Sequence, residues 1–357
     1  MRYKLLGPSG LRVSELCLGT MSFGDAWGFG AGEEESHRIL AAYAEAGGNF
    51  IDSANKYNEG QSEEIVGRFL GSERDRWVLA SKYTLAMRDG DANAAGNSRK
   101  NMRQSVEASL RRLRTDYLDL LFVHAWDYAT PVEEVMRGLD ELVRAGKVNY
   151  VALSDAPAWI ASQANTLAAL RGWSPFVAIQ LEYSMIERTG ERELLPVADA
   201  FGLSVTAWAP MGGGVLTGKY SRHSAEAPQD TKRADRNAMR LTERNLEIAR
   251  HTDRIADELG ATSAQVAIAW VRQRGERIIP IVGVRKHEQL QDVLGSLKLE
   301  LAPEHISSLE EASRIELGFP YTLLQSPLGQ LVYGDLEPNI ELPRTAPYRW
   351  PSTLPSP

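Results

Sequence analysis

Four polar side chains of the kind used in proton transfer follow short apolar runs in the first part of the chain. Asp52 and His124 close the runs NFID and YLDLLFVH, and Lys82 is the next-to-last residue of WVLASKY. Tyr57 follows Asp52 by five residues. If these runs are neighbouring parallel strands, a carboxylate, a phenol, an ammonium group and an imidazole meet at one edge.

That set suits general acid–base chemistry. An ammonium group beside a phenol in a poorly hydrated site favours the phenolate, and so lowers the tyrosine pKa from about 10. Asp52 would balance the charge of Lys82, and His124 could hold a substrate oxygen. We therefore expect Tyr57 to be a general acid whose pKa is shifted toward the working pH.

Each residue also has a structural interpretation, which the residues alone leave open. Lys82 could be a solvated charge, and His124 a hydrogen-bonded core histidine. Asp52 could cap a loop, and Tyr57 could pack with its hydroxyl satisfied. Only the combination of the four favours a catalytic site.

Eight apolar runs, each followed by amphipathic sequence, predict the fold. They are four to eight residues long and do not alternate with polar residues, as in parallel strands buried on both faces. Eight such units favour a closed (β/α)8 barrel over an open doubly wound sheet. The open sheet would normally carry G-x-G-x-x-G after its first strand, and the chain has no such motif. The expected strands are Leu16–Thr20, Asn49–Asp52, Trp77–Tyr83, Tyr117–His124, Val148–Ser154, Phe176–Leu181, Leu203–Trp208 and Ile278–Gly283.

The expected helices include Glu33–Ala46, Ser98–Arg114, Glu191–Phe201, Arg240–Gly260 and Pro303–Arg314. We divide the chain into a barrel over 1–319 and a tail over 320–357, which we expect to pack on the barrel; a substrate lid or an oligomer arm is the alternative. The tail holds 8 of the 17 prolines and several aromatic residues. Residues 221–237 are polar and charged and predict a long loop after the seventh strand.

A glycine-rich segment after the seventh expected strand could hold phosphate. It reads WAPMGGGVLTGKY and contains Pro210, Gly212, Gly214 and Lys219. Glycines let backbone N–H groups approach an anion, and barrels often bind phosphate after strands seven and eight. The basic stretch VGVRKH follows the eighth strand and leads into a helix N-terminus.

The chain resembles the aldo-keto reductases from Tyr3 to about Phe319. The stretches LGPSGLRVSELCLGTMSFG, FIDSANKYNEGQSEEIVGRFL and SLRRLRTDYLDLLFVHAWD carry the resemblance, and S-D-x-P-A-W resembles the aryl-alcohol-dehydrogenase-like branch. It implies NAD(P)H-dependent carbonyl reduction, or the reverse, with the four residues above in the catalytic positions. Tyr57 would protonate the carbonyl oxygen, Lys82 and Asp52 would tune Tyr57, and His124 would orient the carbonyl.

The same resemblance implies the coenzyme contacts. Trp208 would stack on the nicotinamide ring, and Arg285 and Lys286 would suit a 2′-phosphate, so NADP is favoured over NAD. The implied coenzyme-binding residues are Gly19, Thr20, Met21, Asp52, Ser154, Asp155, Gln180, Trp208, Pro210, Gly212, Gly214, Lys219, Gly283, Arg285 and Gln289.

Two positions depart from what many family members carry. Asp155 and Val293 each stand where asparagine is common. The hypothesis for Asp155 is that its charge, beside the nicotinamide ring, stabilises oxidised relative to reduced coenzyme. Val293 removes a polar contact on the adenosine side.

Met21, Trp27, Tyr83 and Trp126 lie near strand ends and could form apolar pocket walls or simply pack. As walls, they predict an aromatic or apolar aldehyde or ketone as substrate.

The composition narrows the possible binding partners, the location and the cofactors of the protein. The chain has 357 residues, a formal charge of −7 and one cysteine. The net negative charge argues against nucleic-acid and anionic-membrane binding, and a single cysteine favours a reducing, cytoplasmic location. We expect no metal, since there is no H-E-x-x-H motif or Cys/His cluster. A homo-oligomer remains possible.

Two other functions remain as alternatives. A lyase could use Lys82 to form a Schiff base with a carbonyl substrate. A regulatory subunit could bind coenzyme with little turnover.

Overall fold

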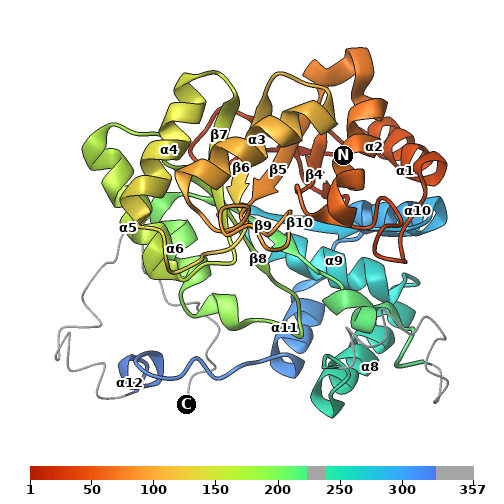
Figure 1. Cartoon of the computed structure of the whole chain (residues 1–357). Coiled ribbons are helices and arrows are strands. Elements are labelled where there is room, and N and C mark those ends of the chain that lie inside the picture. Colours follow the sequence, from red (N-terminus) through yellow and green to blue (C-terminus); the bar gives the residue numbers. More distant parts are fainter. Residues whose placement is uncertain (223–238, 327–357) are drawn as a thin grey trace.

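The computed structural model describes residues 1–222 and 239–326 (Figure 1). Eight parallel strands close into a barrel in the order β10-β3-β4-β5-β6-β7-β8-β9, with helices outside it. The predicted (β/α)8 barrel is therefore confirmed. The barrel strands are β3 Cys17–Gly19, β4 Phe50–Asp52, β5 Val78–Tyr83, β6 Leu118–Val123, β7 Val148–Ser154, β8 Phe176–Glu182, β9 Ser204–Trp208 and β10 Ile278–Gly283.

The helices that follow the strands form the outer layer of the barrel. Their apolar faces pack against the outward side chains of the strands and form one continuous core. The helices are α1 Glu33–Glu45, α2 Gln61–Leu70, α3 Arg99–Leu113, α4 Val132–Arg144, α5 Ala158–Arg171, α6 Leu194–Phe201, α8 Glu243–Glu258, α9 Ser263–Gln273, α10 His287–Gly295, α11 Pro303–Ala312 and α12 Tyr321–Leu324. Short 3-10 turns are η1 Tyr57–Gly60, η2 Gly71–Arg76, η3 Thr189–Glu191, η4 Gly212–Thr217 and η5 Ser296–Lys298.

Side-chain caps begin several of the helices. Ser98 accepts a hydrogen bond from the backbone N–H of Asn101 at the start of α3. Thr262 and Gln265 form a reciprocal capping box at the start of α9. Because these caps satisfy backbone N–H groups that a first helical turn leaves unpaired, they fix where the helices start.

Two helices begin later than expected. The helix expected from Glu191 begins at Leu194 after the turn η3. Proline lacks a backbone N–H, so Pro196 is accommodated in the first turn of α6 but would interrupt a helix begun at Glu191. The helix expected from Arg240 begins at Glu243, because Thr242 caps it with its side chain.

A hairpin that the sequence analysis did not anticipate closes the amino-terminal end of the barrel. It consists of β1 Tyr3–Leu5 and β2 Arg12–Ser14, which pair antiparallel. Leu6 and Val13 are fully buried against the side chains that fill the barrel interior. The hairpin therefore covers this end of the barrel interior.

In the tail, the structure describes α12 and the residues up to Ser326. The hydroxyl group of Tyr321 donates a hydrogen bond to Glu193. Residues 327–357, to which most of the tail prediction applies, and 223–238, which include most of the expected loop, lie outside the described residues. The packing of the tail on the barrel therefore stays a prediction.

No helix within the described ranges is long and apolar enough to cross a membrane.

Candidate active site

The four predicted catalytic residues lie together at the carboxyl ends of β4, β5 and β6. Asp52 is the last residue of β4, Lys82 lies one residue before the end of β5, and His124 directly follows β6. Tyr57 opens the turn η1 that follows β4. The three strands are neighbours in the barrel, so their carboxyl ends bring these side chains to one rim.

Lys82 is at the centre of the group. Its side chain is buried, and its Nζ donates to Asp52 Oδ2 at 2.6 Å, to the Ser53 carbonyl at 3.0 Å and to the Tyr57 hydroxyl oxygen at 3.0 Å. An ammonium group has three protons, so all of them are used. Burial disfavours the ammonium form, but the charge of Asp52 and the bond to Tyr57 outweigh it and raise the pKa of Lys82.

A charged Lys82 does not suit the Schiff-base alternative. Attack on a carbonyl carbon requires a neutral amine, which active-site lysines reach through a lowered pKa. The pKa of Lys82 is shifted in the opposite direction.

The expected pKa shift of Tyr57 is corrected by the structure. Burial outweighs the favourable effect of Lys82 and raises the pKa of Tyr57 to about 12, rather than moving it toward neutral pH. The phenol therefore carries its proton at neutral pH. Because Lys82 donates to the phenol oxygen, the phenol proton remains available for another acceptor.

His124 completes the group as a neutral imidazole. Its ring lies edge-on to the ring of Tyr57, with the centroids 5.8 Å apart. Burial, and to a lesser degree the charge of Lys82, lowers the pKa of His124 to about 3. Its Nδ1 is buried and has no hydrogen-bond partner within residues 1–222 and 239–326.

We predict that His124 makes the protein less stable in mild acid. The unfolded chain takes up a proton near pH 6.5, whereas folded His124 stays neutral down to about pH 3. This contribution to stability is therefore lost as the pH falls from 6.5, by up to about 1.4 kcal/mol per pH unit. The free energy of unfolding, measured with urea, should fall between pH 7 and pH 5 in the wild type. In His124→Gln this fall should be smaller by about 2 kcal/mol. An identical pH dependence in the two proteins would contradict the neutral, buried histidine.

Asp52 has a second partner that sequence reasoning missed. Gln180, on β8, donates its Nε2 to Asp52 Oδ1 at 2.9 Å, so both carboxylate oxygens are hydrogen-bonded. Gln180 was expected only to contact the coenzyme. No spacing signal in the sequence links residues 128 positions apart, since the link arises only when the barrel closes.

The residues expected beside the nicotinamide lie close to this group. Asp155 follows β7, and its Oδ1 accepts a hydrogen bond from Trp208 Nε1 at 3.0 Å. Ser154 pairs in register with Gln180. Asp155 and Trp208 also line a cavity of about 300 Å³. The structure therefore brings these four predicted residues to one part of the rim.

The predicted phosphate contacts lie at the ends of β9 and β10. Gly212 and Gly214 have positive φ values of 59° and 102° in η4, and a Cβ at Gly214 would meet nothing within 4 Å. The open approach to this backbone fits a bound phosphate. Pro210 is buried, and Lys219 is exposed.

Part of the segment after β10 is also suited to binding an anion. Gly283 pairs with Gly19 of β3, and the backbone N–H of Arg285 donates to Gln289 at 2.9 Å. Lys286 precedes α10 and is exposed. However, Glu35 already accepts the first N–H of α10, from His287 at 2.6 Å. The hydrogen bonds and charge for a bound anion must therefore come from the basic side chains and the other N–H groups of the first turn.

Gly19 ends β3 and pairs with Asp52, and Thr20 and Met21 directly follow this strand. The N–H of Thr20 donates to the Asp52 carbonyl at 2.9 Å, and its hydroxyl donates to the same oxygen at 3.0 Å. Met21 is 45% exposed at the mouth. Val293 is buried on α10, which agrees with its apolar character.

The candidate substrate walls divide into two groups. Trp27 lies edge-on to Tyr57, with the ring centroids 6.5 Å apart, so it borders the site. The Trp126 side chain is nearly buried beside the rim, and the backbone N–H of Trp126 donates to the Asp155 carbonyl. Tyr83 is fully buried in the outer core between strands and helices. Successive side chains of a strand point to opposite faces, so Lys82 in the mouth places Tyr83 outside the barrel, and Tyr83 is not a wall.

Sequence reasoning also missed a buried network of hydrogen-bonded side chains behind η1, the turn that carries Tyr57. Glu63 on α2 is fully buried, accepts from the Ser81 hydroxyl at 2.5 Å and pairs with Arg112 Nε at 2.7 Å. It ties α2 and α3 to β5, the strand that carries Lys82. The SEE sequence in the first turn of α2, ahead of the apolar residues of that helix, is the signal that could have indicated it.

The part of the chain that the structure describes holds no cluster of three or more potential metal ligands.

Comparison with known proteins decides the family. The model of the aldo/keto reductase family matches residues 15–314. The chain belongs to the aldo-keto reductase family. It is thus an NAD(P)H-dependent reductase that acts on a small-molecule substrate.

Relatives of this aldo-keto reductase include aryl-alcohol dehydrogenases. A putative aryl-alcohol dehydrogenase, AAD14, of Saccharomyces cerevisiae is 38% identical, with 88% of this chain and 87% of the relative covered. Aryl-alcohol dehydrogenase [NADP(+)] of Phanerodontia chrysosporium is also 38% identical, with coverages of 90% and 88%. Norsolorinic acid reductase A of Aspergillus parasiticus is 37% identical, with coverages of 90% and 84%.

Proposed function

We propose that this aldo-keto reductase reduces aromatic aldehydes or ketones to alcohols with NADPH, or catalyses the reverse oxidation. The observation that carries the proposal is the position of Lys82, within hydrogen-bond distance of both Asp52 and the Tyr57 hydroxyl at the barrel mouth. The two aryl-alcohol dehydrogenases and the norsolorinic acid reductase among the relatives favour an aromatic substrate.

In the proposed mechanism, NADPH supplies a hydride to the carbonyl carbon. Tyr57 donates its phenol proton to the carbonyl oxygen, which gives the alcohol and leaves a phenolate. Lys82 stabilises the phenolate as it forms, because its ammonium group already donates to that oxygen. Asp52 and Gln180 hold Lys82 in place, and a proton from solvent restores the phenol.

His124 and the aromatic residues position the substrate. The neutral imidazole of His124 orients the carbonyl oxygen beside the tyrosine hydroxyl, and Trp27 supplies an apolar wall against an aromatic ring. Met21 and Trp126 remain candidates for the rest of the wall. Asp155, Trp208, η4 and the start of α10 would hold the coenzyme along the rim.

NADPH oxidation at 340 nm tests this function directly. With a panel of aromatic and aliphatic aldehydes and ketones, we expect turnover to be fastest with aromatic compounds. Tight coenzyme binding without turnover across the panel would contradict the proposal and favour the regulatory-subunit alternative.

We propose NADP rather than NAD as the coenzyme because Arg285 and Lys286 lie at the end of β10. A guanidinium group suits a phosphate because it can donate two parallel hydrogen bonds. In Arg285→Gln, the ratio of kcat/KM for NADPH to that for NADH should fall by about tenfold, on the order of 1.4 kcal/mol. The control Arg171→Gln, on α5, should leave the ratio unchanged. An unchanged ratio in Arg285→Gln would remove this residue from the coenzyme site.

Asp155 is proposed to favour the oxidised coenzyme, because its carboxylate is held at the mouth by Trp208. In Asp155→Asn, the affinity for NADP+ relative to NADPH should fall by roughly threefold to tenfold at pH 7.5, an effect on the order of 1 kcal/mol. Burial raises the pKa of Asp155, so the wild-type preference should fade as the pH falls through that raised pKa. Fluorescence titration with each coenzyme form measures the ratio. Equal ratios in wild type and variant would refute the hypothesis.

The cytoplasmic location and the possibility of a homo-oligomer stay predictions, as do the absence of nucleic-acid partners and the tail boundary at residue 320.

A further inference from the structure

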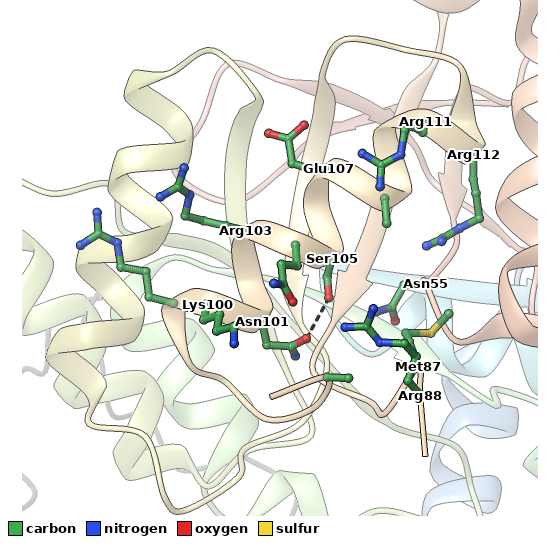
Figure 2. Close-up of a pocket in the computed structure, with 14 residues that line it drawn as sticks. Asn55, Met87, Arg88, Lys100, Asn101, Arg103, Ser105, Glu107, Arg111 and Arg112 are labelled. Atoms are coloured by element: carbon green, nitrogen blue, oxygen red, sulfur yellow. Dashed lines mark hydrogen bonds between the residues drawn. The ribbon is translucent and has the colours of Figure 1, made fainter. Parts of the chain in front are cut away.

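A second and larger cavity lies outside the barrel mouth. It has a volume of about 860 Å³ and lies against α3, between that helix and the segments that follow β4 and β5 (Figure 2). None of the residues predicted to bind substrate or coenzyme lines it. Its size is within the range of small-molecule sites.

The cavity is strongly basic, although the chain as a whole is acidic. Its lining contains six lysine and arginine residues but only one acidic residue, Glu107. Ion pairs neutralise some of these cations: Arg88 pairs with Asp91, and Arg112 pairs with Glu63. Within the described residues, three form no ion pair: Lys100, Arg103 and Arg111.

Two of the residues that line the cavity carry buried polar groups without a partner among the described residues. The side chain of Asn55 is fully buried, and neither its Nδ2 nor its Oδ1 is hydrogen-bonded to any residue that the structure describes. The Nη2 of Arg112 is likewise buried and unpaired. Asn55 and Arg112 both line the cavity, and Figure 2 shows Lys100 and Arg103 extending from the end of α3 opposite to the end that carries Arg112. Buried polar groups are nearly always hydrogen-bonded, so this pair requires a partner.

The same two side chains lie behind the segment that carries Tyr57. Asn55 precedes Tyr57 by two residues, and its backbone N–H donates to the Lys82 carbonyl at 3.2 Å. The stem of Arg112 packs against Gly60, the last residue of η1, where a Cβ would lie 2.9 Å from Cδ of the arginine. A molecule bound between Asn55 and Arg112 would therefore contact the back of η1.

We propose that this cavity binds a small oxyanion, a molecule with a phosphate or carboxylate group. Its oxygens accept hydrogen bonds from Nδ2 of Asn55 and Nη2 of Arg112, and Arg111 adds positive charge at the entrance. This binding is separate from the reductase reaction and does not depend on the proposed function.

Calorimetric titration with pyrophosphate and with citrate, at constant ionic strength and saturating NADP+, tests the site. The two probes separate phosphate from carboxylate ligands, and saturation with NADP+ blocks the predicted coenzyme site. We expect the wild type to bind at least one of them, Asn55→Leu to bind it about tenfold more weakly, and Arg111→Gln several-fold more weakly. Arg171→Gln, which removes the same charge from α5, should bind as the wild type does.

The proposal also predicts an unusual effect of Asn55→Leu on the melting temperature. Leucine has nearly the shape of asparagine and carries no polar group to leave unpaired, so the melting temperature without ligand should not fall. Should this variant fold poorly, Arg111→Gln, on the exposed face of α3, still tests the site.

Hydrogen exchange locates the bound anion. Protection on binding should appear in residues 55–63 and 85–112. The proposal is overturned if neither probe binds, if both cavity variants bind as the wild type does, or if protection instead appears around residues 210–219 and 283–289.

Discussion

Replacing Tyr57 by phenylalanine should lower kcat for aldehyde reduction by roughly 10²- to 10⁴-fold, the usual contribution of a general acid. The substitution removes only the hydroxyl that Lys82 contacts at 3.0 Å. The binding of NADPH should therefore stay within about twofold of the wild type, on the view that the hydroxyl acts on the substrate oxygen. Stopped-flow and coenzyme-fluorescence measurements separate the two effects.

Tyr3→Phe is the matched control for this substitution. Tyr3 lies on the hairpin at the opposite end of the barrel, where its hydroxyl donates to the Gly47 carbonyl, and its loss should leave kcat unchanged. The pH dependence gives a second check: with a pKa of about 12, Tyr57 should keep its proton, and reduction should not slow through this group until well above neutral pH. Turnover that survives in Tyr57→Phe would mean that another group donates the proton.

Replacing Lys82 by methionine should lower the free energy of unfolding by about 3–5 kcal/mol and abolish turnover. Lys82 and Asp52 are both nearly inaccessible to solvent, so removing one partner leaves an uncompensated charge in the interior. The raised pKa of Lys82 means that this stabilisation is present below about pH 10 and is lost as the pH rises through the raised value. Urea unfolding at pH 7.5 measures the loss.

The double variant Lys82→Met with Asp52→Asn separates stability from catalysis. It removes both charges while keeping an oxygen for Gln180 to bond, so most of the lost stability should return. Turnover should not return, because no ammonium group is left to stabilise the phenolate. A single variant as stable as the wild type, or an active double variant, would contradict the role assigned to this pair.

The sequence was sufficient to predict the barrel and the placement of Asp52, Tyr57, Lys82 and His124 at its rim. A parallel strand buried on both faces appears as a short continuous apolar run, and polar residues at the ends of such runs stand out. Because consecutive strands are neighbours in this barrel, the order of Asp52, Lys82 and His124 in the chain translates directly into proximity.

What the sequence could not predict depends on contacts that form only when the barrel closes. The bond from Gln180 to Asp52 joins strands on different sides of the barrel. The direction of the Tyr57 pKa shift depends on how burial balances against the charge of Lys82, which residue types do not specify. Tyr83 was misplaced because one residue along a strand reverses the face.

Transfer of deuterium is the most direct test of the central claim. Wild-type protein would be incubated with benzaldehyde and NADPH that carries deuterium at both C4 positions, and the product analysed by mass spectrometry and NMR. The account predicts that the wild type forms benzyl alcohol with one deuterium on the former carbonyl carbon. Tyr57→Phe should not form this alcohol at a comparable rate. Alcohol without deuterium, or no alcohol from any aromatic carbonyl although NADPH is bound, would contradict it.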